Sequence, residues 1–385
     1  MMGETPSLRS TKTLVRGARQ LLTLRGPSGP RRGAAMGELG IVTDGAVLIR
    51  GGKILEAGPS RRLENLGLAR GAHEIDATGR VVMPGFVDSR TQPVSTPAVP
   101  ARRLEAYAQS VLDGMARHGT TTVATSAGGG LDPSEMLAAL RMLSGLNGRP
   151  LDVIPDCHIA APADTEAICT ELLPLLARRK LAQMVSVNCE AFDEPVTRRI
   201  LEQAHSLGFR TTVCAKASAG CVRLAIEVQA AAVVLQRMES AGVADLGLAR
   251  PVYTLIPPYI YRRRLENAPA RALLEAGGAV ALASGFGFEH CPTYNMQMVV
   301  SLACSEMGMS PAEAISAATI NGAHALARGH LCGSLEPSKA ADLLLLNVAD
   351  YRELPAQFGV NHVHMALKNG HVIYREGEVA SWAVE

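Results

Sequence analysis

Short apolar runs joined by turns dominate the chain up to residue 84. Runs compatible with strands span 14–24 and 46–50. Gly51-Gly52 then provides a two-residue turn into another apolar run at 53–58, a pattern typical of a β-hairpin. A further strand fits 74–82. Because no helical segment separates these strands, we expect them to form an antiparallel layer of their own.

From Phe86 onwards, apolar strands alternate with helix-sized segments. Residues 104–117 and 133–143 have the apolar spacing of helices, and Asp132 is placed to cap the second one. Strands are predicted at 86–88, 120–124, 153–159, 184–189, 210–215, 231–235, 251–256 and 279–284. Eight strands alternating with helices indicate a (β/α)₈ TIM barrel.

After the barrel the pattern returns to strands. A helix is predicted at 311–326, followed by strands at 341–346, 362–368 and 371–374, the last two joined by an Asn-Gly turn. We expect them to join the N-terminal layer. The predicted domains are a composite β-sandwich of residues 13–84 plus 335–385, and a barrel of residues 85–334. Residues 1–12 are polar, and we predict that they are disordered.

The composition fits a barrel joined to a smaller unit. The chain has 385 residues, of which 47% are hydrophobic and 19% are charged, and its formal net charge is +2. A barrel takes about 250 residues, which leaves room for the second unit. Runs of basic residues, such as Arg31-Arg32 and Arg262-Arg263-Arg264, are short. We expect a solvated face there and no nucleic-acid or membrane partner.

Two further features bear on the cellular compartment. No apolar run approaches the roughly 18 residues of a membrane span, and the N-terminus lacks the pattern of a signal peptide. The eight cysteines show no C-x-x-C spacing, which is typical of reduced thiols in a cytosolic protein. We therefore expect a cytoplasmic protein without a disulfide scaffold.

The end of the first barrel strand carries polar residues. Asp88, Arg90 and Gln92 follow the apolar start of this strand. The carboxyl ends of barrel strands are where such folds place their chemistry. Arg90 and Gln92 are therefore expected to face a cleft.

This strand also carries a resemblance to a known family. The segment VMPGFVDSRTQ, from Val82, resembles the opening strand of the amidohydrolase superfamily, whose motif is Pro-Gly-Phe-Val-Asp-X-His-X-His. Within that superfamily the chain most resembles imidazolonepropionase, which hydrolyses the ring of imidazolone propionate. The resemblance covers about 14–376 and rests on GPRRGAAMGELGIVTDGAVLIR, GTTTVATSAGGGLD, NCEAF, CPTYNMQMVVSLAC, GSLEPSKAADLLL and DYRELPAQFGVN.

The resemblance implies one divalent metal, zinc or iron, held by four histidines and one aspartate. In this sequence those five positions are occupied by Arg90, Gln92, Cys214, Val234 and Gly285. A glutamate that assists the water falls on Ala217, and a tyrosine that contacts the substrate falls on Gly129. Arginine is permanently cationic and offers no lone pair to a metal. We therefore predict no metal cofactor.

The remaining polar residues could still bind a ligand. His158 matches a histidine that the resemblance places against the substrate, and Glu190 lies near it in the predicted topology. Arg90 and Gln92 have two interpretations. They could fill a degenerate site by bonding each other or carboxylates such as Asp88 and Glu190. Alternatively, they could bind an anion, since a buried guanidinium suits carboxylate or phosphate geometry.

Candidate catalytic groups also follow from the strand ends. Lys216 could act as a base or Schiff-base nucleophile, and Cys214 could be a nucleophile activated by Lys216 or His158. A replacement zinc site is a further alternative, built from Cys189, Cys214, His158, His290 and Cys291. Most lysines in proteins are solvated and most buried cysteines are structural, so these readings are more common than catalytic or metal-binding roles.

Three hypotheses follow. In the first, the chain is an imidazolonepropionase-like protein that has lost its metal centre and ordinary C–N hydrolysis, and binds a small anionic ligand. In the second, it hydrolyses cyclic amides with a rewired metal-free, thiol or Cys/His site. In the third, the barrel is inert and acts through assembly, for which the dimers implied by the resemblance provide a route.

Overall fold

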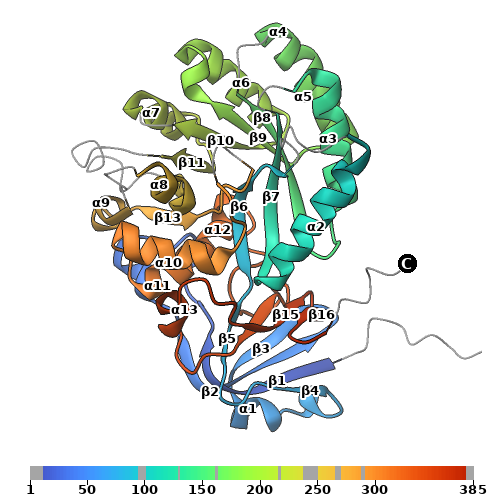
Figure 1. Cartoon of the computed structure of the whole chain (residues 1–385), viewed down its shortest axis with the longest axis vertical. Coiled ribbons are helices and arrows are strands. Elements are labelled where there is room, and N and C mark those ends of the chain that lie inside the picture. Colours follow the sequence, from blue (N-terminus) through green and yellow to red (C-terminus); the bar gives the residue numbers. More distant parts are fainter. Residues whose placement is uncertain are drawn as a thin grey trace, which may run out of the picture.

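Two separate sheets organise the chain (Figure 1). The computed structural model describes residues 12–93, 101–128, 131–160, 164–215, 218–236, 250–264, 270–287 and 291–378. The barrel, surrounded by helices, occupies one end of the long axis, and the second sheet occupies the other end. The first eleven residues, most of the segment predicted to be disordered, lie outside the described residues.

Eight parallel strands form the barrel, in the order β13-β12-β11-β10-β9-β8-β7-β6. They are β6 Phe86–Thr91, β7 Thr120–Gly128, β8 Asp152–Ile159, β9 Met184–Asn188, β10 Arg210–Ala215, β11 Ala232–Leu235, β12 Val252–Leu255 and β13 Ala279–Leu282. The Gly285 N–H donates to the Arg90 carbonyl at 3.1 Å, and the Gln92 N–H donates to the Phe286 carbonyl at 2.7 Å. These bonds join the chain after β13 to the first strand, and the predicted (β/α)₈ barrel is confirmed.

Helices pack around the barrel where the apolar spacing predicts them. The predicted helices at 104–117 and 133–143 correspond to α2 and α3. The helices are α1 Ser60–Glu64, α2 Leu104–Arg117, α3 Pro133–Gly145, α4 Thr165–Ala167, α5 Leu173–Arg179, α6 Glu194–Ser206, α7 Ala219–Glu227, α8 Pro257–Arg263, α9 Ala270–Glu275, α10 Met296–Met307, α11 Pro311–Ala318, α12 Ile320–Ala325 and α13 Glu353–Ala356. Within the described ranges, no helix has both the length and the apolar character that crossing a bilayer requires.

The predicted single helix at 311–326 is wrong, because Thr319 divides it into α11 and α12. Thr319 has φ −127° and ψ −94°, which is not helical, and its hydroxyl donates to the Ile315 carbonyl at 2.7 Å. The break redirects α12 towards the barrel. There Ala323 and Leu326 join a buried cluster whose barrel members are Val87, Ala124, Ile154 and Met184.

The second sheet combines both ends of the chain, in the order β16-β15-β14-β5-β1-β2-β3, with β4 beside β1. Its strands are β1 Lys12–Leu22, β2 Ile41–Arg50, β3 Lys53–Pro59, β4 His73–Asp76, β5 Val81–Pro84, β14 Leu343–Leu346, β15 Val363–Lys368 and β16 His371–Arg375. Lys12, predicted to be disordered, pairs with Arg50 instead. The division into 13–84 plus 335–385 and 85–334 stays a prediction.

The start of α3 offers a test of local stability. Asp132 Oδ1 accepts hydrogen bonds from the Ser134 N–H at 2.7 Å and the Glu135 N–H at 2.9 Å, and Glu135 bonds the Asp132 N–H in return. We expect Asp132→Ala to lower the free energy of unfolding by about 1 kcal/mol, because two amide groups lose their acceptor. Urea denaturation measures this. Asp132→Ser, which keeps a capping oxygen, should recover most of the loss, and equal losses in both variants would contradict the capping role.

Candidate ligand site at the barrel mouth

The candidate site lies at the carboxyl end of the barrel strands, called here the barrel mouth. Arg90 belongs to β6, Gln92 follows that strand directly, and His158 lies near the end of β8. Their exposed fractions are 6%, 4% and 7%. The Gln92 amide donates to the carbonyl of Gly128, which pairs with His158 in the barrel sheet. The fold therefore brings three predicted ligand-binding residues to the ends of β6 and β8, which flank β7.

Arg90 contacts two groups of β8. Its Nη1 lies 3.7 Å from Oδ2 of Asp156. Its Nη2 lies 3.3 Å from Nδ1 and 3.5 Å from Nε2 of His158. Asp156 and His158 are two residues apart on one strand, so both side chains point to the same face of the sheet. Asp156 is therefore a carboxylate partner of Arg90 that was not named among the candidates Asp88 and Glu190.

Two buried hydroxyl groups support Asp156. The Oγ atoms of Ser126 and Ser186 each donate to Asp156 Oδ2 at 2.6 Å. Ser126 pairs with Asp156 across β7 and β8, and Ser186 lies on the neighbouring β9. All three residues are at most 3% exposed. This arrangement stabilises a charged carboxylate inside the barrel, because each hydroxyl proton offsets part of the lost solvation.

The hydrogen bonds indicate the tautomer of His158. Its Nδ1 lies 2.9 Å from Oγ of Ser186, whose own proton goes to Asp156. The Nδ1–H can therefore donate to Ser186, which leaves Nε2 to accept from Arg90, a group that only donates. Burial lowers the pKa of His158 well below its ordinary value, and the charge of Arg90 lowers it further. The imidazole is neutral at pH 7.

Asp88 is the second buried carboxylate at this end of the first strand. It has no exposed surface. Its Oδ1 accepts from the Ser284 N–H at 3.0 Å and from the Arg90 N–H at 3.3 Å. Burial raises the pKa of Asp88 to about 6 in spite of these bonds. Asp88 therefore links β6 to the segment that follows β13.

Cys214, a predicted nucleophile, lies in apolar surroundings at the end of β10. It packs against a cluster formed by Val234, Ile256, Tyr259, Ala283 and Cys291. Burial raises the pKa of the Cys214 thiol, although the charge of Arg90 acts in the opposite direction. A protonated thiol is a poor nucleophile. The other proposed nucleophile, Lys216, lies outside the described residues.

Cys189 and Cys221 form a disulfide, so the expectation of reduced thiols is wrong for this pair. Cys189 directly follows β9, and Cys221 lies in the first turn of α7, which follows the neighbouring strand β10. The two positions are 32 residues apart in sequence. Adjacent parallel strands bring their ends together, a proximity that cysteine spacing does not reveal. The bond also removes Cys189 from the set of candidate metal ligands.

The described members of the suggested zinc set do not assemble into a group of three metal ligands. His290 lies outside the described residues. Among the residues that are described, no three of the histidine, cysteine, aspartate and glutamate side chains are grouped to hold a metal ion. Glu190 is exposed and accepts a hydrogen bond from the Ser218 N–H at 3.3 Å. It lies at the rim, and its role in binding stays a prediction.

Ser126, Asp156 and Ser186 are the site residues that sequence reasoning missed. Each is a polar residue in a strand that is mostly buried, and all three are buried themselves. A buried polar residue needs a hydrogen-bond partner, so such positions were a usable signal. Their convergence depends on the alignment of three neighbouring strands.

Comparisons with known proteins define the class of this fold. An amidohydrolase family model matches residues 185–373. Among solved structures, a triazine hydrolase variant has a TM-score of 0.72 and 18% identity, with 95% of each chain covered. The guanine deaminase of E. coli has a TM-score of 0.71 and 16% identity, covering 95% of this chain and 100% of its own. These structures share the amidohydrolase fold, a TIM barrel with a β-sandwich domain.

Relatives of known sequence narrow the class to one family. The imidazolonepropionase of Solibacter usitatus is 34% identical, covering 93% of this chain and 97% of its own length. That of Geobacillus kaustophilus is also 34% identical, covering 95% of this chain and 98% of its own. The chain therefore belongs to the imidazolonepropionase family.

Proposed function

We propose that this member of the imidazolonepropionase family binds a small anionic ligand at the barrel mouth and does not carry out metal-dependent C–N hydrolysis. The observation that carries the proposal is the buried guanidinium of Arg90. It lies on β6, where the family resemblance places a metal-ligating histidine. A permanent cation at this position favours an anion over a metal ion.

The residues at the expected metal positions do not fit zinc or iron. Arg90 would repel either ion, and Val234 is an apolar member of the cluster that surrounds Cys214. Gly285 has no side chain, and its N–H bonds the Arg90 carbonyl. Zinc and iron require imidazole, thiolate or carboxylate ligands.

The charge distribution supports an anion in particular. Asp156 shares its Oδ2 between two hydroxyl donors and lies 3.7 Å from Arg90, which is longer than a well-formed charged hydrogen bond. A ligand carboxylate at the barrel mouth would be attracted by the charge of the same guanidinium. The named relatives act on imidazolone propionate, whose propionate group is such a carboxylate. The alternative of thiol-dependent hydrolysis has less support, because burial raises the pKa of Cys214.

Calorimetric titration with imidazolone propionate tests the proposal. We expect Arg90→Gln to weaken binding by about 10- to 100-fold, since hydrogen bonds to charged groups contribute roughly 1.5–3 kcal/mol. Asp156→Asn keeps an acceptor for Ser126 and Ser186 but removes the competing charge, so it should bind the anion more tightly. The double variant removes both charges together, and it should fold and bind about as weakly as Arg90→Gln.

The control is Arg61→Gln. Arg61 is an exposed residue of helix α1, which packs against β2 and β3 of the second sheet. This variant should bind the ligand like the wild type. Unchanged affinity in Arg90→Gln would overturn the role of this residue. Elemental analysis and an assay for hydrolysis of imidazolone propionate, with zinc or iron added, test the second half of the proposal. Stoichiometric metal together with turnover would overturn it.

A further inference from the structure

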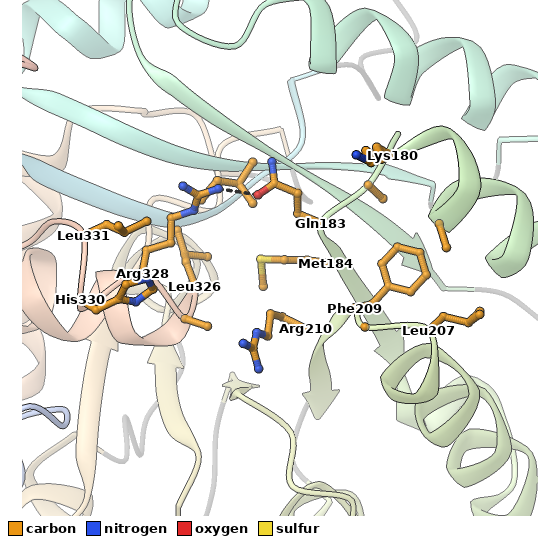
Figure 2. A pocket seen from close by; sticks show the side chains of 15 residues that line it. Lys180, Gln183, Met184, Leu207, Phe209, Arg210, Leu326, Arg328, His330 and Leu331 are labelled. Atoms are coloured by element: carbon orange, nitrogen blue, oxygen red, sulfur yellow. Dashed lines mark hydrogen bonds between the residues drawn. The ribbon is translucent and has the colours of Figure 1, made fainter. Parts of the chain in front are cut away.

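A cleft opens at the end of the barrel where the strands begin, opposite the barrel mouth. We call it the bottom cleft. Its walls come from the starts of β9 and β10, the chain after α5 and the chain after α12. Its volume is about 560 Å³, within the roughly 300–1,000 Å³ of ligand pockets. Figure 2 shows Arg328 and His330 on one side, Lys180 and Phe209 on the other, and Arg210 between them.

The charges that line the bottom cleft are all of one sign. Lys180, Arg210 and Arg328 line it together with His330, and no carboxylate is among its lining residues. Lys180 and Arg210 form no ion pair with any residue in the described ranges. The Arg328 guanidinium donates to the neutral side chain of Gln183 (Figure 2). The charged side chains that line the cleft are therefore basic, and such a lining attracts an anion.

The deeper wall of the bottom cleft is apolar. Ile154, Met184, Phe209 and Leu326 are each at most 6% exposed. Ile154, Met184 and Leu326 also belong to the cluster that α12 forms with the barrel interior. This wall is supported by the fold on several sides, and it would contact the body of a ligand whose charged group meets the arginines.

We propose that the bottom cleft binds an amphipathic organic anion, with its apolar body against Met184 and Phe209 and its charged group between Arg210 and Arg328. Guanidinium groups suit carboxylates, sulfonates and phosphate monoesters alike. The site is separate from the barrel mouth, and the inference does not depend on the proposed function. Arg210 and Arg90 lie at opposite ends of the barrel strands.

The test uses 8-anilinonaphthalene-1-sulfonate, a fluorescent anion with an apolar body. We expect saturable binding of one molecule per chain that weakens as the salt concentration rises. Arg210→Gln and Arg328→Gln should each weaken binding by about tenfold, as expected for the loss of one charge-assisted contact. N-phenyl-1-naphthylamine has the same apolar body without the sulfonate, and it should bind at least about tenfold more weakly.

Three controls keep the result specific. Arg61→Gln removes a cation far from the cleft and should bind the probe like the wild type. Leu331→Trp adds bulk at a residue that lines the cleft and is 43% exposed, so it should reduce binding without changing any charge. Circular dichroism confirms that each variant folds. Wild-type affinity in folded Arg210→Gln and Arg328→Gln, or equal affinity for the neutral probe, would overturn the proposal.

Discussion

Replacing Lys368 by methionine is expected to lower the free energy of unfolding by about 3–5 kcal/mol, because it leaves a buried carboxylate without its cation. Lys368 is 5% exposed, and its Nζ lies 2.6 Å from Asp342 and 2.7 Å from Asp152. Burial alone would lower the pKa of Lys368, but the two carboxylates hold it above its ordinary value. The lysine is charged at pH 7. Urea denaturation of wild type and variant measures the loss.

A matched control tests whether the loss of stability comes from the burial of the ion pair or would follow from the loss of any ion pair. Arg16 lies 2.7 Å from Glu74, but these side chains are 43% and 56% exposed. Arg16→Met should therefore destabilise the protein far less than Lys368→Met. The double variant Lys368→Met with Asp342→Asn should recover much of the loss, since it no longer buries a lone charge. A loss below about 1 kcal/mol in Lys368→Met would contradict the pairing.

This ion pair also explains how the two sheets are held together. Lys368 ends β15 in the second sheet, whereas Asp152 begins β8 in the barrel. Asp342 precedes β14, and it also accepts the Asn369 N–H at 2.9 Å. Because charge-assisted hydrogen bonds have a defined geometry, this contact helps to fix the position of one sheet relative to the other.

The barrel could be predicted from the sequence because its signals are local. Each strand is a short apolar run, and the intervening helices have their own spacing and caps. The division of 311–326 at Thr319 could not be predicted in this way. The helical spacing continues across the break, and only packing against the barrel interior requires α12 to turn.

The candidate site could be predicted only in part. Arg90 and Gln92 could be placed because the residues that end a barrel strand face the mouth. The partners of Arg90 depend on which residues of neighbouring strands align. His158 pairs with Ser186 across β8 and β9, and Ser126 pairs with Asp156 across β7 and β8. Register between strands far apart in sequence is set by tertiary packing, so Asp156 was missed.

Asp88 makes the stability of the protein depend on pH in a defined direction. Its pKa rises from 3.8 to about 6 on folding, chiefly because of burial. The folded state therefore holds the proton more tightly than the unfolded state. The resulting stabilisation is present below pH 3.8 and is lost as the pH rises to about 6. A shift of this size corresponds to about 3 kcal/mol.

We therefore expect Asp88→Asn to gain up to about 3 kcal/mol of stability relative to the wild type between pH 3.5 and pH 7. The amide keeps an oxygen for the N–H groups of Ser284 and Arg90 but cannot ionise. Urea denaturation of both proteins at several pH values gives the difference. Asp350→Asn is the control. Hydrogen bonds from Arg352 lower the pKa of Asp350. The stability of Asp350→Asn relative to the wild type should therefore fall as the pH rises, which is the opposite of the change expected for Asp88→Asn. A difference between Asp88→Asn and the wild type that does not vary with pH would show that Asp88 is ionised with an ordinary pKa in the folded protein.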